Sequence, residues 1–150
     1  MSIIDQIRSI ALPIIESKGA YAIELAVRGE GRGRRVEAFI DSDNGVTTDL
    51  CAEISRGLAR SLDAADIVPG SYHLVVSSPG IDRPLKFPRQ YPKNIGRRMT
   101  VRWKNQYTVQ RIDGKLVEAT EGGITLQLVN GDVQQISFDA ILDARVLSAF

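Results

Sequence analysis

The sequence predicts a mixed α+β protein with two parts, an N-terminal two-layer α/β domain and a small C-terminal β-barrel. Three observations support this prediction. Apolar residues recur at helical spacing in two segments of the first half of the chain. Short alternating runs, typical of strands, lie around these segments and fill the last third. Between the two parts lies a segment that holds four of the six prolines.

The first predicted helix begins near the N-terminus. Its apolar stripe repeats at spacings of four, three and four residues and consists of Ile3, Ile7, Ile10 and Ile14. Pro13 lies inside this stripe and lacks a backbone N–H, so it predicts a kink or a late break. Gly19 follows the stripe and is a candidate for the helix end.

The rest of the first part reads as strand, strand, helix and strand. Alternating residues over 21–28 and 36–40 flank a polar, glycine-rich turn and predict a hairpin. Leu50, Ile54, Leu58 and Leu62 form a second helical stripe. Thr47 or Thr48 is a natural N-cap for it. A third strand is expected over 72–77, and two helices can cover one face of a three-stranded sheet.

The second half has a different pattern. Short β-like runs are expected over 99–103, 108–118, 124–129, 133–136 and 143–147. Even spacing of short strands favours a small closed barrel. We therefore predict an α/β domain over 1–78, a proline-rich connector over 79–95 and a β-barrel over 96–150.

The net charge of +1 is nearly neutral, but the cations are unevenly distributed. From Arg83 to Ile112 there are nine basic residues and no acidic residue. Such a run produces a local positive field. Phe87, Tyr91, Trp103 and Tyr107 lie within it, and exposed aromatic side chains can stack on bases. The alternative is that Trp103 and Tyr107 are core residues of the barrel. This is most readily expected for Trp103, because charged and apolar residues alternate around it.

The candidate RNA-contacting residues lie in this run. They are Lys86, Arg89, Lys93, Arg97, Arg98, Arg102 and Lys104. A solvated domain surface is the alternative explanation of the same charges.

Enzyme chemistry finds no support in the sequence, and we expect no catalytic residue. The only histidine is His73, expected as a half-buried strand residue. Ser77 lies four residues further along the same predicted strand, about 13 Å away, whereas proton transfer needs about 3 Å. The glycine-rich turn between the first two strands lacks the lysine and the following helix of a phosphate-binding loop.

No metal site and no cofactor are expected. One cysteine and one histidine cannot form a zinc site of the usual kind. Cys51 is expected to be a small buried residue of the second helix. A single cysteine favours a reducing cytoplasm, and the N-terminus lacks the basic start and apolar core of a signal peptide.

The segment Val76-Ser77-Ser78-Pro79-Gly80-Ile81-Asp82-Arg83-Pro84-Leu85 resembles a long and unusual motif of the bacterial ribosome maturation factor RimP family. The resemblance extends over essentially the whole chain. It includes the start of the second helix and the late Phe138-Asp139-Ala140-Ile141 run.

This resemblance implies that the C-terminal barrel is SH3-like. It implies a non-enzymatic, cytoplasmic factor that binds immature small (30S) ribosomal subunits and assists their assembly. It also implies contact with small-subunit ribosomal protein twelve. No run of eighteen apolar residues occurs, so no membrane span is expected, and we expect no small-molecule substrate. We expect a monomer. The barrel would meet a basic ribosomal protein through its scattered acids, Asp132, Asp139 and Asp143.

Two roles remain open for the family motif. Ser77, Ser78, Pro79, Gly80, Asp82, Arg83 and Pro84 could form a turn or hinge, or could contact the ribosome directly. Two other functions also remain open. A stand-alone protein acting on messenger or small RNA would bind free RNA tightly, and a pure protein adaptor would bind with little dependence on salt.

Overall fold

The computed structural model describes residues 2–80 and 83–148. The chain divides into two compact units, one ending at Pro79 and the other beginning at Gly80. Each unit has its own hydrophobic core, so each is described separately.

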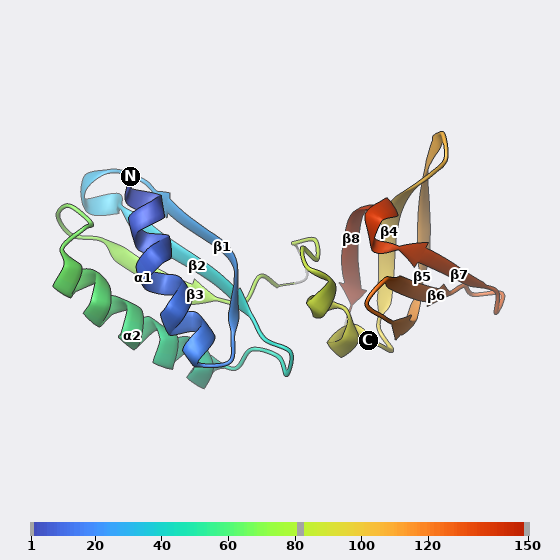
Figure 1. Ribbon diagram of the computed structural model, residues 1–150, viewed down its shortest axis with the longest axis horizontal. Coiled ribbons are helices and arrows are strands. Elements are labelled where there is room, and N and C mark those ends of the chain that lie inside the picture. The colour runs from blue at the N-terminus through green and yellow to red at the C-terminus, as the bar shows by residue number, and fades with distance from the viewer. Residues whose placement is uncertain (1, 81–82, 149–150) are drawn as a thin grey trace. The chain divides into compact units, whose positions relative to one another are not determined.

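The first unit has the predicted order of helix, strand, strand, helix and strand. Its elements are α1 (Ile3–Ser17), β1 (Tyr21–Arg28), β2 (Arg35–Asp41), α2 (Thr48–Ala65) and β3 (His73–Ser77). In the sheet β2 is central, antiparallel to β1 and parallel to β3. Both helices lie on the same face of this sheet (Figure 1). The predicted two-layer α/β arrangement is therefore confirmed.

The helix ends follow the local chemistry of the sequence. The Thr47 hydroxyl oxygen accepts a hydrogen bond from the Leu50 N–H at 3.1 Å and caps α2. At the end of α1, the N–H groups of Gly19 and Ala20 donate to the Glu16 and Ile15 carbonyls. Gly19 has a φ of +80°, which completes a Schellman motif. Of the kink or late break predicted at Pro13, the break is wrong, because α1 continues to Ser17 with this proline on its exposed side.

The second unit is built mainly of antiparallel strands. They are β4 (Arg98–Asn105), β5 (Thr108–Ala119), β6 (Gly123–Gln127), β7 (Val133–Ser137) and β8 (Ile141–Ser148). Their order in the sheet is β7-β6-β5-β4-β8. Within the described residues no pairing of β7 with β8 closes this sheet, so the predicted closed barrel is not confirmed.

The segment expected as a connector, 79–95, belongs from Gly80 onward to the second unit. It contains two short 3-10 helices, η2 (Pro88–Gln90) and η3 (Pro92–Asn94). Tyr91 is 3% exposed and packs in the core of the unit with Met99 and Leu116. The Leu85 N–H donates to the Ala144 carbonyl of β8 at 2.7 Å.

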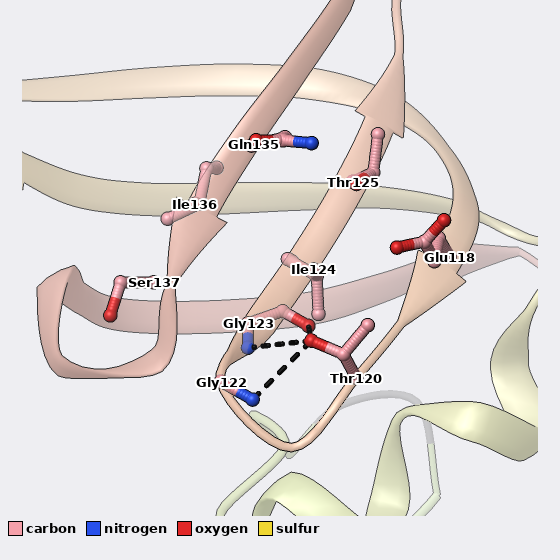
Figure 2. Close-up of a pocket in the computed structure, with 9 residues that line it drawn as sticks. All are labelled: Glu118, Thr120, Gly122, Gly123, Ile124, Thr125, Gln135, Ile136 and Ser137. Carbon is pink, nitrogen blue, oxygen red and sulfur yellow. Dashed lines mark hydrogen bonds between the residues drawn. The ribbon is translucent and has the colours of Figure 1, made fainter.

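The tight turn from β5 to β6 depends on glycine. The Thr120 hydroxyl accepts hydrogen bonds from the Gly122 and Gly123 N–H groups, at 3.3 Å each (Figure 2). A Cβ added to Gly123 would collide with the carbonyl oxygen of Ile136 on β7. A Cβ added to Gly122 would meet no atom within 4 Å. The two adjacent glycines therefore differ in their tolerance of a side chain.

We predict that Gly123→Ala destabilises the second unit by about 1–3 kcal/mol, because β7 must shift away from the new methyl group. Gly122→Ala is the matched control and should change stability by less than about 0.5 kcal/mol. Trp103 is the only tryptophan and lies in this core, so its fluorescence during urea unfolding reports on the second unit. Equal urea midpoints for the two variants would contradict the prediction.

Candidate nucleic-acid interface

Strand β4 divides its side chains cleanly between the core and the solvent. Met99, Val101 and Trp103 are buried at 0%, 0% and 9% exposure. Side chains alternate along a strand, so the residues between them point to the opposite face. Arg98, Arg102 and Lys104 are accordingly exposed. The burial of Trp103 confirms its predicted core role.

The strand pairing adds cations from the neighbouring strands to the same face. Arg98 lies directly opposite Lys115 of β5, and Arg102 lies opposite Arg111. Thr100 lies opposite Arg145 of β8. We call this surface the basic face and define it by its cations, which are Arg98, Arg102, Lys104, Arg111, Lys115 and Arg145.

Two acids lie within the basic face and reduce its charge only in part. Asp143 lies 3.8 Å from Arg102 and 3.5 Å from Arg145, and Asp113 lies 3.7 Å from Arg111. Arg98 and Lys115 form no ion pair with any residue that the structure describes. Like charges placed directly opposite each other destabilise a sheet. A bound polyanion would relieve this repulsion, so the arrangement suits phosphate groups.

The hairpin between β4 and β5 carries an exposed aromatic ring beside this face. Tyr107 is 94% exposed at its tip, close in sequence to Lys104. The other three aromatic residues of the basic run pack into the protein: Trp103 and Tyr91 are buried and Phe87 is half-buried. Tyr107 is therefore the one aromatic residue of that run with a ring fully open to a nucleotide base.

The predicted cations ahead of β4 lie in a different setting. Lys86 has its ammonium group 5.4 Å from the centre of the Phe87 ring. Burial lowers the pKa of Lys93, and the nearby positive charge of Arg97 lowers it further. Arg97 donates to the Asn94 side-chain oxygen at 3.2 Å. Arg89 is exposed on η2. These four residues precede β4, so they are not among the solvent-facing side chains of that strand.

The three candidate protein-contacting acids do not form one surface. Asp132 precedes β7 and Asp139 follows it, on a short 3-10 helix, η4 (Phe138–Ala140). These two acids are exposed and lie at opposite ends of β7. Asp143 is instead held by two arginines within the basic face.

The family motif spans the boundary between the units. Ser77 ends β3, and Ser78 and Pro79 follow it in the first unit. Gly80 has a φ of +72°, a conformation that favours glycine. Asp82 lies outside the described residues. Arg83 is half-buried and Pro84 is exposed, just before the anchored Leu85.

The single histidine and the single cysteine, which were considered for enzyme chemistry and metal binding, both lie in the first unit. His73 is exposed on β3, so its predicted half-burial is wrong. Cys51 is half-buried against the first core, and burial raises the pKa of its thiol. No group of three or more metal-ligating side chains occurs in the part of the chain that the structure describes. None of its helices is long and apolar enough to cross a membrane.

A two-unit α+β protein with a basic, partly uncompensated sheet face fits the class of nucleic-acid-binding proteins. Residues 10–82 match the family model described as the RimP N-terminal domain. This match supports the RimP family, whose members are ribosome maturation factors. The resemblance stated from the sequence is confirmed over these residues. The match ends before the basic face begins, so that face rests on the geometry of the second unit alone.

Sequence reasoning missed three cations of the basic face as candidate contacts: Arg111, Lys115 and Arg145. Arg111 belongs to the basic run. It precedes the half-buried Ile112 on a strand, and this alternation indicated that Arg111 points to the solvent. Lys115 and Arg145 lie beyond the run and join the face only through the strand register.

We predict that Lys115→Gln leaves the stability of the second unit unchanged or raises it by about 0.2–1 kcal/mol, because it removes the repulsion opposite Arg98. The same variant should weaken binding to RNA. Trp103 fluorescence during urea unfolding measures the first effect, and a fluorescence anisotropy titration with RNA measures the second. A clear loss of stability would show that this pair of like charges is not repulsive in the folded protein.

The buried Tyr91 hydroxyl predicts a loss of stability at alkaline pH. Burial and the negative charge of Asp143 raise the pKa of Tyr91 from 10.0 to about 12. Above pH 10 the unfolded chain releases this proton while the folded chain keeps it. The free energy of unfolding of the second unit should therefore fall from about pH 10 to about pH 12. Tyr91→Phe should flatten this fall, whereas the exposed control Tyr107→Phe should retain it, with Trp103 fluorescence as the probe.

Proposed function

We propose that this chain is a non-enzymatic maturation factor that binds immature small (30S) ribosomal subunits and assists their assembly. The observation that carries this proposal is the basic face, where Arg98 opposes Lys115 and Arg102 opposes Arg111. Such a face has an electrostatic reason to bind ribosomal RNA, which is a polyanion. The match of residues 10–82 to a family of ribosome maturation factors supports the same partner.

Lys104 and Tyr107 extend the proposed contact to the hairpin tip. The ammonium group of Lys104 would neutralise a phosphate, and the exposed ring of Tyr107 would stack on an unpaired base. Lys86, Arg89, Lys93 and Arg97 would contact RNA from the segment ahead of β4. Lys93 is the weakest of these candidates, because it is half-buried whereas Lys86 and Arg89 are exposed.

The second unit is proposed to be an SH3-like barrel. Five antiparallel strands with the first strand between the second and the fifth support this assignment. The short helix η4 before the last strand supports it as well. We propose small-subunit ribosomal protein twelve as the protein partner, contacting the exposed Asp132 and Asp139. Asp143 fits this role less well, because two arginines already neutralise it.

The Ser77–Pro84 motif is proposed to act first as a turn. The positive φ of Gly80 and the anchoring of Leu85 on Ala144 support a role in the chain path. A direct ribosome contact through Ser78, Asp82 or Arg83 is the other role. We propose a monomeric, cytoplasmic protein without a cofactor.

We predict selective co-sedimentation of the protein with small subunits over large subunits and whole ribosomes. The double variant Arg98→Gln/Lys115→Gln should reduce the bound fraction severalfold and make the remaining binding less sensitive to salt. Arg8→Gln/Arg32→Gln is the control, because it removes the same charge from exposed positions in the first unit. Pelleting at low and moderate salt, with each subunit separately, is the measurement.

Three outcomes would contradict the proposed function. Equal binding to both subunits would remove the small-subunit assignment. Absence of subunit binding together with tight binding to free messenger or small RNA would favour a stand-alone RNA-binding protein. Subunit binding that is insensitive to salt would favour a protein adaptor.

A further inference from the structure

We propose a second phosphate-binding site in the first unit, in a groove between α1 and α2, that holds the phosphodiester backbone of ribosomal RNA. This inference rests on the proposed function and adds a site that neither the basic face nor the family motif includes. The groove has a volume of about 490 Å³. Its lining residues are Ile14, Ser17, Lys18, Glu53, Arg56, Gly57, Arg60 and Ser61.

The groove forms where the two helices approach each other at a glycine. Gly57 of α2 faces Ile14 of α1, and an added Cβ would lie 3.2 Å from the Ile14 Cγ2 atom. Larger side chains one turn away on each side, at Glu53 and at Arg60 and Ser61, rise above this point. The result is a depression with an apolar floor and polar walls. A phosphate group lying over the floor would be within reach of the cations on the walls.

The charge of the groove is positive and only partly compensated. Three cations, Lys18, Arg56 and Arg60, meet one acid, Glu53. Glu53 lies 3.9 Å from Lys18 and neutralises that lysine in part. Arg56 and Arg60 are exposed and form no hydrogen bond or ion pair with any described residue.

The two arginines also repel each other. They are four residues apart on α2, so they are neighbours on the same helix face. Like charges at this spacing destabilise a helix. This is the same feature that marks the basic face, namely two cations held side by side without an acid between them. An anion between the two guanidinium groups would remove the repulsion and form charge-assisted hydrogen bonds with both.

The remaining lining favours a phosphate backbone over a base or a peptide. The Ser61 hydroxyl borders the groove and can donate to a phosphate oxygen, whereas the Ser17 hydroxyl donates to the Ile14 carbonyl at 2.7 Å. No aromatic ring lines it, so it offers no platform on which a base could stack. Its only carboxylate, Glu53, is already close to Lys18. The groove therefore fits a ligand that presents consecutive anionic groups along a strand.

The test uses the full chain with two probes that contain RNA, namely purified small subunits and a free structured RNA. Arg56→Gln/Arg60→Gln removes both unpaired cations and keeps good helix formers at both positions. Circular dichroism should show unchanged helix content. We expect a roughly tenfold loss of affinity for each probe, and a decrease of about 1.5 in the slope of log K against log salt. Arg60→Gln alone should show about half of the slope change.

Arg8→Gln is the matched control for Arg60→Gln. Arg8 is an exposed arginine of α1 that does not line the groove. A loss of affinity equal to that of Arg60→Gln would overturn the groove proposal, because it would show a general effect of net charge. An unchanged salt slope for the double variant would also overturn it.

The two proposals can fail separately. If the wild-type protein binds small subunits and Arg56→Gln/Arg60→Gln has the same slope of log K against log salt as the wild type, the groove proposal fails and the proposed function stands. Suppose instead that the wild-type protein does not bind small subunits, but that Arg56→Gln/Arg60→Gln decreases the salt dependence of binding to free RNA. The proposed function then fails and the groove proposal stands. A polyglutamate peptide of equal charge is the third probe. Its preferential binding, lost in the double variant, would overturn the RNA assignment in favour of an acidic protein segment.

Discussion

The pairing of β4 with β5 is the constraint on which the second unit depends. Eight residue pairs run from Arg98–Lys115 to Asn105–Thr108 without a bulge, although the pairings of β4 with β8 and of β5 with β6 both contain irregularities. Side chains alternate between the two faces, so a slip of one residue would move Val101 to the solvent and Arg102 into the core. The burial of the core residues thus also fixes the cations on the opposite face. The register of β4 with β5 thus determines both the core residues and the cations of the candidate interface.

The basic face and the interhelical groove share an energetic property. In both, the folded chain brings like charges together although a neutral side chain would be tolerated at these exposed positions. A ligand that binds only the folded state stabilises it by mass action. Polyanions such as RNA would therefore raise the stability of both units, and salt would weaken this effect by screening. Surface repulsion in the free protein and the proposed affinity for RNA would thus change together.

Sequence reasoning succeeded where structure depends on residues close in the chain. The helical stripes, the Thr47 cap and the end of α1 at Gly19 all follow from neighbours within one or two turns. It failed at Pro13, because a proline on the exposed side of a helix with a well-buried opposite face need not end it. It also could not place Lys115 beside Arg98, since seventeen positions separate them and only the register joins them. The uncompensated pair Arg56 and Arg60 was visible as an i, i+4 spacing, but its groove depends on the contact of Gly57 with Ile14.

The family match and the basic face come from parts of the chain that do not overlap. Residues 10–82 carry the match, while the basic face begins at Arg98. The family match and the basic face are therefore independent observations that both support a ribosomal partner. The groove lies within the matched part, so each unit carries one proposed phosphate-binding surface. When two modest sites share a chain, the second contact forms at a high effective concentration once the first has formed. The length and stiffness of the Ser77–Pro84 segment then bear on affinity even if none of its side chains touches RNA. A turn role for this motif and a role in ribosome binding are thus compatible.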